Sequence, residues 1–426
     1  MELRMNEMSY LSDLKEQKHQ VWAPEIASFF SNPWFERAWI YQEVVCSKSA
    51  TVYSGLCDAS ESIARNSLPW NCLTRFYKIA EELEALENRP TSICSVIGSL
   101  IFGQTHYDAN NRIGNLTDLL TLLELRRDSK VTDARDKIFS LVELSNEGQQ
   151  SRVLADYSKS VVEVYTSTAR SIINSRKDLR ILSAVQQSPG QSDLPSWVPD
   201  WREQWHGKHL ISAALKSFKQ FDDTTAASFT ATAGRYLKLH DEECSNQLSL
   251  YGKSFSRIKI LADVVTNALE YGSTFSTGVA HLYEMGFPRS PKYPRTELTS
   301  AAVLYMTMMT FRSLVNQPEN LTTKTCLDNV GLSEEKRGTS SVASSTRRLF
   351  LTENDYIGFA PANTAVGDEI CLLFGGDVPY VVRERDDSHQ FIGECYCYGI
   401  MNGEAVRTCT GKEDQDSKNE KLYVLA

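Results

Sequence analysis

Residues 194–201, with the sequence LPSWVPDW, constrain the fold of this chain more than any other segment. Pro195 and Pro199 lie four residues apart, and a proline lacks an amide hydrogen and disfavours helical backbone in the residue before it. The segment is therefore predicted to be extended. Because Trp197 and Trp201 add two large apolar side chains, we expect a strap that crosses a hydrophobic core and buries both indoles.

Length, charge and hydrophobicity narrow the class of protein. The chain has 426 residues, enough for two or three domains, and 42% of them are hydrophobic. A formal net charge of −9 argues against nucleic acid as a partner, since sequence-independent binding needs a basic surface. No apolar run approaches the ~20 residues that cross a bilayer, and the start shows no signal peptide. We expect a cytoplasmic protein that does not contact a membrane.

The hydrophobic periodicity predicts a mixed α/β (α+β) fold, with helices in the N-terminal half and antiparallel strands near the C-terminus. Asn32 and Pro33 mark the start of a helix that we expect to run to Ser47. Asn115 is the expected cap of a helix over 116–125, and two more helices are predicted over 133–144 and 158–173. Five regions are expected: 1–57, a mainly helical region at 58–227, a mixed α/β region at 228–330, a small antiparallel β unit at 346–410 and a charged tail at 411–426.

Six groups of motifs follow one another over most of the chain. They are WFERAWIYQE at 34–43, ARDKIF at 134–139, DYSK at 156–159, PSWVPDW at 195–201, LSLYGKSFSRI at 248–258, and a final group with RRLFLTENDYIG at 347–358. In this order they resemble the fungal heterokaryon incompatibility (HET) domain family, with Phe139 where the family has tyrosine. The motif positions are Trp34, Arg37, Trp39, Gln42, Arg135, Asp136, Asp156, Tyr157, Trp197, Pro199, Asp200, Trp201, Gly367, Asp368, Gly403 and Glu404.

The resemblance implies a role in non-self recognition and fungal programmed cell death signalling. Its partners would be proteins of unknown identity, with self-association among the options. Two segments that open the HET domain, Y-x-x-L-S-Y-x-W-G and I-D-x-x-x-I-N-Q, do not occur here. We therefore expect residues 1–57 to be the C-terminal remnant of a TIR-like HET domain, in an N-terminally truncated member that is not catalytic in this form.

Glu43 is the one candidate catalytic residue. HET domains are thought to be remote relatives of TIR domains, and NAD-cleaving TIR domains carry a glutamate on a similar helix. Trp39 and Glu43 are four residues apart, so they share a helix face. The alternative function is thus NAD cleavage, with Glu43 stabilising an oxocarbenium-like centre as glycosidase carboxylates do. Otherwise Glu43 forms an ion pair with Arg37 or another cation, and no cofactor is expected.

The remaining motifs favour structural roles. Arg135 and Asp136 could bind a phosphate or a partner's carboxylate, but an ion pair beside a helix cap is the simpler interpretation. The tryptophans of 194–201 could form a ligand platform, yet a hydrophobic clamp is commoner. Glycines at 367, 375 and 376 are expected in turns, and Cys395 and Cys397 as buried thiols. The histidine spacing is too weak for a metal site, so none is expected.

Overall fold

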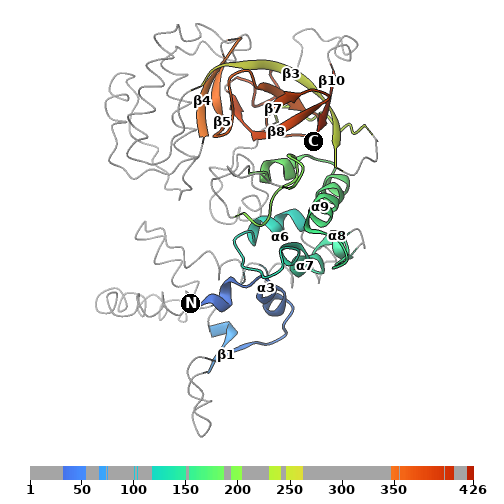
Figure 1. Ribbon diagram of the computed structural model, residues 1–426. Helices are drawn as coiled ribbons and strands as arrows, with labels where there is room; N and C mark the ends of the chain where they lie inside the picture. The colour runs from blue at the N-terminus through green and yellow to red at the C-terminus, as the bar shows by residue number, and fades with distance from the viewer. Residues whose placement is uncertain are drawn as a thin grey trace, which may run out of the picture. The chain divides into compact units, whose positions relative to one another are not determined.

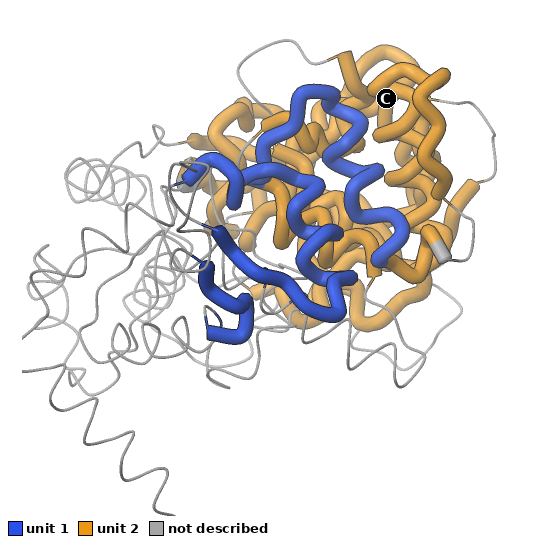
Figure 2. Tube along the Cα trace, turned by 90° about the horizontal axis from the view of Figure 1, so that it is seen from below, with its two compact units in different colours: residues 1–117, 128–144 blue, residues 118–127, 145–426 orange. Residues whose placement is uncertain are grey.

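The computed structural model describes residues 32–53, 67–72, 74, 100, 103, 118–149, 153–186, 193–203, 230–240, 246–261, 347–354, 356–397, 399–406 and 420–426. The chain divides into two compact units, coloured in Figure 2: residues 1–117 with 128–144, and residues 118–127 with 145–426. The expected mixture of helices and sheets, with a β-rich C-terminal part, is confirmed.

In the first unit, the aromatic segment after Asn32 is not one continuous helix, so that prediction is wrong. Asn32 does act as the expected cap, because its side chain accepts the Trp34 N–H at 2.9 Å. A short 3-10 helix, η1 (Pro33–Glu36), ends at Arg37, whose backbone is extended, and α3 (Ala38–Val45) follows. The break arises because Lys130 pairs with this backbone: its N–H donates to the Glu36 carbonyl at 2.6 Å and its carbonyl accepts from Ala38 at 3.1 Å.

The described part of the first unit also contains a small sheet and a second helix. Strand β1 (Thr51–Tyr53) pairs with β2 (Ser67–Pro69), and α7 (Asp136–Val142) packs against α3. Phe35 and Tyr41 are buried, whereas Trp34 is 37% exposed. The α7 helix that contacts α3 has the buried apolar side chains Ile138, Phe139, Leu141 and Val142.

The second unit begins with helices: α6 (Leu119–Leu125), α8 (Asn146–Gln149), α9 (Val161–Arg176) and the 3-10 helix η3 (Arg180–Ala184). The expected cap Asn115 lies outside the described residues, and α6 begins after Asp118, whose carboxylate accepts the Thr121 N–H at 3.1 Å. Ser160 and Glu163 form a capping box at the start of α9. This reciprocal pair fixes where α9 begins.

Eight strands of the second unit form one sheet (Figure 1): β3 (Leu248–Leu261), β4 (Arg347–Thr352), β5 (Ile357–Pro361), β6 (Glu369–Leu373), β7 (Tyr380–Arg385), β8 (Ser388–Glu394), β9 (Tyr396–Cys397) and β10 (Lys421–Leu425). Their order is β10-β8-β7-β6-β3-β4-β5-β9. Since β10 also pairs with β3, the strands β3, β6, β7, β8 and β10 close into a ring.

Two expectations about the C-terminal half differ from the structure. The strands of 228–330 and 346–410 were expected in separate regions, but β3 pairs with both β4 and β6. A charged tail was expected at 411–426, and residues 421–425 of it form β10, because Tyr423 and Leu425 enter the core and are fully buried there.

The core of the sheet has two faces. Ile370 and Leu372 of β6 join one hydrophobic cluster with residues of β3, β4, β5 and β8. The alternate β6 residues Cys371 and Leu373 are equally buried. β6 is thus covered on both faces, which explains why the four residues after Glu369 are all apolar. Among the described helices, none has the length and apolar character needed to cross a membrane.

Candidate functional site

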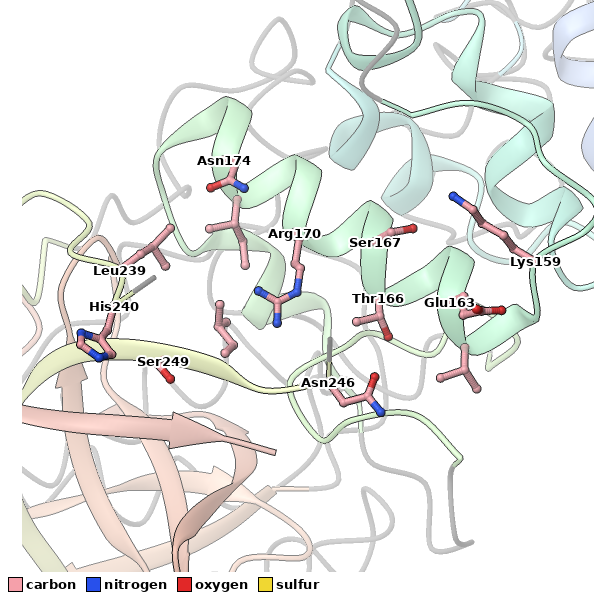
Figure 3. Close-up of a pocket in the computed structure, with 13 residues that line it drawn as sticks. Lys159, Glu163, Thr166, Ser167, Arg170, Asn174, Leu239, His240, Asn246 and Ser249 are labelled. Carbon is pink, nitrogen blue, oxygen red and sulfur yellow. The ribbon is translucent and has the colours of Figure 1, made fainter. Parts of the chain in front are cut away.

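A groove of about 730 Å³ lies between α9 and the start of β3, within the second unit (Figure 3). The face of α9 forms one wall, and residues beside the start of β3 form the other. Most of its side chains are polar, with apolar ones interspersed. The residues that line it are Lys159, Val162, Glu163, Thr166, Ser167, Arg170, Ile173, Asn174, Leu239, His240, Asn246, Leu248 and Ser249.

The α9 wall follows from helix periodicity. Glu163, Thr166, Arg170 and Asn174 are three or four residues apart and therefore lie along one face (Figure 3). The Glu163 carboxylate is held by the capping box, where the Ser160 N–H donates to it at 2.8 Å. Hydrogen bonds from the Ser160 backbone and hydroxyl lower the pKa of Glu163, so it stays ionised at neutral pH. The Thr166 hydroxyl is buried and makes no hydrogen bond to any residue that the structure describes.

Arg170 links the groove to the strap at 194–201. Its guanidinium lies over the Trp197 ring, 5.3 Å from the centroid, and donates to the Gln247 carbonyl. The Trp197 indole N–H in turn donates to the Asn246 carbonyl at 3.1 Å. These contacts hold Arg170 in a defined position and fix the backbone just before β3.

The second wall is short extended backbone beside β3. The His240 N–H donates to the Ser249 carbonyl at 3.0 Å, and Leu239 bridges to Leu250. The His240 ring meets Tyr251 edge-on, with centroids 6.2 Å apart. The groove therefore offers charged, hydroxyl, amide and apolar groups in an elongated, open arrangement, which suits the binding of an extended polar segment better than bond-breaking chemistry.

Glu43 lies outside this groove. It is exposed on α3, in the first unit, one turn after the half-buried Trp39, as the spacing predicted. Within the described part of the chain, no ion pair involves the Glu43 carboxylate, and Arg37 lies before the helix, in extended backbone. Gln42, also on α3, is half-buried. The structure thus places Trp39, Gln42 and Glu43 on one short helix, with Arg37 directly before it.

The motif residues of the middle segments hold local structure. Asp133 accepts from the Arg135 backbone at 2.9 Å and from its guanidinium at 2.6 Å, and these bonds lower the pKa of Asp133. The Arg135 pair is therefore a local one, and Asp136 is the first residue of α7. Asp156 accepts from the Ser158 hydroxyl at 2.6 Å, which lowers its pKa and forms the turn before α9. The neighbouring Tyr157 is 50% exposed.

The strap buries both tryptophans, as predicted: Trp197 is 0% and Trp201 is 1% exposed. Pro199 is also buried. Asp200 pairs with Arg202, whose guanidinium donates to it at 2.8 Å. A hydrophobic clamp, with its carboxylate bound locally, therefore accounts for this segment.

Arg127 is a residue that the motif analysis missed. Its guanidinium is buried over the Trp201 ring at 5.0 Å and donates to the carbonyls of Ala184, Asp200 and Glu203 at 2.7, 2.9 and 3.0 Å. The one available signal was a pair of arginines directly after the apolar sequence LLTLLEL. A charged side chain at that point is usually read as the solvent-facing end of a helix.

The C-terminal motif residues lie in turns. Gly367 has a φ of 93°, and the buried Asp368 beside it accepts from Arg383 at 2.7 Å. Gly403 has a φ of 86°, and Glu404 accepts the Asn402 N–H at 2.7 Å. The prediction that Gly367 lies in a turn is confirmed, and its positive φ is a conformation that favours glycine.

The buried thiols are confirmed as well. Cys395 and Cys397 are fully buried and free, and burial raises the pKa of both. Neutral thiols of this kind are unreactive. Over the described ranges, no three His, Cys, Asp or Glu side chains come close enough to hold a metal ion.

Comparison with known proteins agrees with the motifs. Residues 319–415 match the Het-6 beta-barrel domain. The chain is 24% identical over 339 residues to "Heterokaryon incompatibility protein 6, OR allele" of Neurospora crassa, a match that covers 65% of this chain and 50% of the relative. The chain thus spans about half the length of this relative. No solved structure matches it.

These matches confirm the resemblance to heterokaryon incompatibility proteins. Strands β4 to β9 lie inside the matched residues 319–415, whereas β3 and β10 lie outside them. Because β3 and β10 belong to the closed ring of strands, the folded sheet extends beyond the residues that match the domain.

Proposed function

We propose that the chain acts in heterokaryon incompatibility, recognising non-self and signalling programmed cell death in the fungal cytoplasm. The observation that carries this proposal is the match to heterokaryon incompatibility protein 6 over 339 residues, together with the matched domain at 319–415. The cell-death role and the cytoplasmic location extend the family resemblance to this chain and are part of the proposal.

We assign residues 1–57 a role different from that of the rest of the chain. Residues 1–57 would be the remnant of a TIR-like HET domain in a helix-rich N-terminal half, and would not be catalytic in this form. The exposed position of Glu43 supports this view, since a carboxylate that acts on a bound nucleotide normally lies in a cleft. The alternative function, NAD cleavage by Glu43, predicts that the purified chain releases nicotinamide.

The groove beside α9 is proposed as the place where a partner protein binds. Its length along α9 and its mixed lining favour an extended peptide segment with polar and small apolar side chains. Ser167 and Asn174 are exposed on the α9 wall, so either position can be enlarged without disturbing the core.

The test uses forced heterokaryons of Neurospora crassa in which one parent expresses the full chain from an inducible promoter. We expect induction to lower the viability of fused cells, scored with a vital dye, and to spare unfused cells. Asn174→Arg should weaken the response by filling the groove. Asn402→Arg, which places the same side chain at an exposed position outside the groove, should leave it unchanged.

Two results would contradict the proposal. If the chain accumulates in fused cells and viability does not change, the incompatibility role is wrong. If Asn174→Arg and Asn402→Arg behave alike while induction still kills, the role stands and the groove is not the partner site.

A further inference from the structure

The C-terminal strand β10 closes the sheet by contacts of unequal strength. On one side it pairs with β3 over five consecutive residues, from Lys421–Gly252 to Leu425–Leu248. On the other side it meets β8 at one register pair, Leu425–His389, supported by the Ala426 N–H donating to the His389 carbonyl at 3.1 Å. Ser196 links the two strands at this end, since its hydroxyl donates to the Ala426 carbonyl and accepts the Phe391 N–H at 2.8 Å. The direct pairing of β10 with β8 is therefore much shorter than its pairing with β3.

A buried carboxylate anchors the side chains of β10. Glu369 of β6 accepts the Tyr423 hydroxyl at 2.6 Å and the Lys421 ammonium at 2.8 Å. Both donors come from β10, and the Glu369 side chain is only 3% exposed. Burial opposes ionisation of Glu369, but the hydrogen bonds from Lys421 and Tyr423 prevail and lower its pKa. The anchor is thus charged and intact at neutral pH.

His389 lies at the single β8–β10 register pair, and its ring is held differently from the Glu369 carboxylate. Its ring lies 5.0 Å from the Tyr423 ring. Within the described part of the chain, both of its ring nitrogens are buried and neither makes a hydrogen bond of normal geometry. The Val424 backbone of β10 is a nearby acceptor, and its effect on the pKa of His389 is smaller than that of burial. A neutral imidazole tolerates this environment, but an imidazolium has two N–H donors and a full charge that both require partners.

The charged groups that face His389 do not supply those partners. Lys421 of β10 repels a positive ring. Glu369 of β6 is already bound by two donors, and Glu384 of β7 accepts from Arg257 at 2.7 Å. Glu384 is also the cross-strand partner of His389 in the β7–β8 hairpin, and Asp386 and Asp387 are exposed in the turn of that hairpin.

We propose that β10 is a proton-sensitive latch, in which protonation of His389 releases the strand from β8 and opens the closed sheet at mildly acidic pH. The edges of β8 and β10 that had faced each other would then be available for pairing with another strand. This inference is independent of the groove and of the proposed function.

Low pH favours the open state because His389 binds a proton more readily there than in the closed state. Burial lowers the pKa of His389 below its usual value, and the positive charge of Lys421 lowers it further. In the open state the ring titrates near its ordinary pKa of about 6.5. The open state therefore binds more protons below that pH, so closure is strongest above about 6.5 and weakens as pH falls. At pH 5.5 the open population can rise by up to about tenfold.

Cys371 reports on the opening. It lies two residues from Glu369 on the same face of β6, so it belongs to the region that β10 covers, and it is a free, fully buried thiol. The intact chain is treated with 4,4′-dipyridyl disulfide, which reacts with thiols at acidic pH, and labelled peptides are read by mass spectrometry. Cys395 and Cys397 serve as internal references, because they belong to the hydrophobic cluster on the other face.

We expect labelling of Cys371 to rise between pH 7.5 and 5.5 by up to about tenfold, relative to the urea-unfolded chain at each pH, while Cys395 and Cys397 stay protected. His389→Phe keeps a ring against Tyr423 and removes the titration, so it should abolish the rise. His240→Phe, at an exposed histidine, should preserve it. His389→Gln serves if the phenylalanine variant does not fold.

Three outcomes would overturn the latch. Labelling of Cys371 that does not change with pH excludes opening. A rise shared equally by Cys371, Cys395 and Cys397 indicates global unfolding instead. A rise that persists without an imidazole at position 389 removes His389 as its cause.

Discussion

Replacing Arg127 with methionine should remove a large part of the folding free energy of the second unit. The guanidinium is 1% exposed and donates to three carbonyls, those of Ala184, Asp200 and Glu203. A hydrogen bond from a charged donor contributes about 1.5–3 kcal/mol. Methionine fills part of the space over Trp201 but leaves the carbonyls unpaired, so we expect a loss of about 4–6 kcal/mol, against a total stability of about 5–15 kcal/mol.

Urea denaturation followed by tryptophan fluorescence measures this loss, since Trp201 lies directly under the guanidinium. Arg257→Met is the matched control, because Arg257 is exposed and its ion pair with Glu384 is a surface pair, which contributes little to stability. Arg127→Lys should fall between the two, since an ammonium keeps the charge but cannot reach all three carbonyls. Equal midpoints for Arg127→Met and Arg257→Met would contradict the assignment of Arg127 as the centre of this buried network.

Three further outcomes are expected. Gly403→Ala should destabilise the chain by about 1–3 kcal/mol in thermal unfolding, because φ is 86° and the added Cβ would lie 2.7 Å from the Ala233 Cβ; an unchanged Tm would show that this turn relaxes freely. Because the folded-state pKa of Glu369 is lowered, its stabilisation is present above about pH 4.5 and is lost as pH falls. Glu369→Gln should therefore flatten the pH dependence of the Tm below that value, and an unaltered profile would exclude Glu369 as its source. The purified chain should release no nicotinamide from NAD, and Glu43→Gln should leave the Tm unchanged; nicotinamide release that Glu43→Gln abolishes would establish the alternative function instead.

Local sequence rules were sufficient for several elements. The prolines at 195 and 199 exclude helix whatever the surroundings, and two indoles beside them have no favourable place except a core, so the buried strap could be predicted. Asn32 before Pro33 predicted a helix start for the same local reason. The motifs also sufficed to identify the family resemblance, since their order along the chain does not depend on the fold.

Contacts between residues distant in sequence decided the rest. The helix predicted from residue 33 stops at Arg37 because the backbone pairs with Lys130, almost a hundred positions away, and no helix propensity encodes that pairing. The residues of β10 read as the end of a charged tail until β3 and β8 give Tyr423 a buried site.

The functional candidates divide in the same way. Glu43 could be identified from its motif, but whether a carboxylate lies in a cleft depends on what packs around it, and here it is exposed. Arg127 and His389 carry no recognisable motif. Their importance comes from burial, which makes each hydrogen bond or missing partner costly, and burial is set by residues that only the tertiary structure brings together.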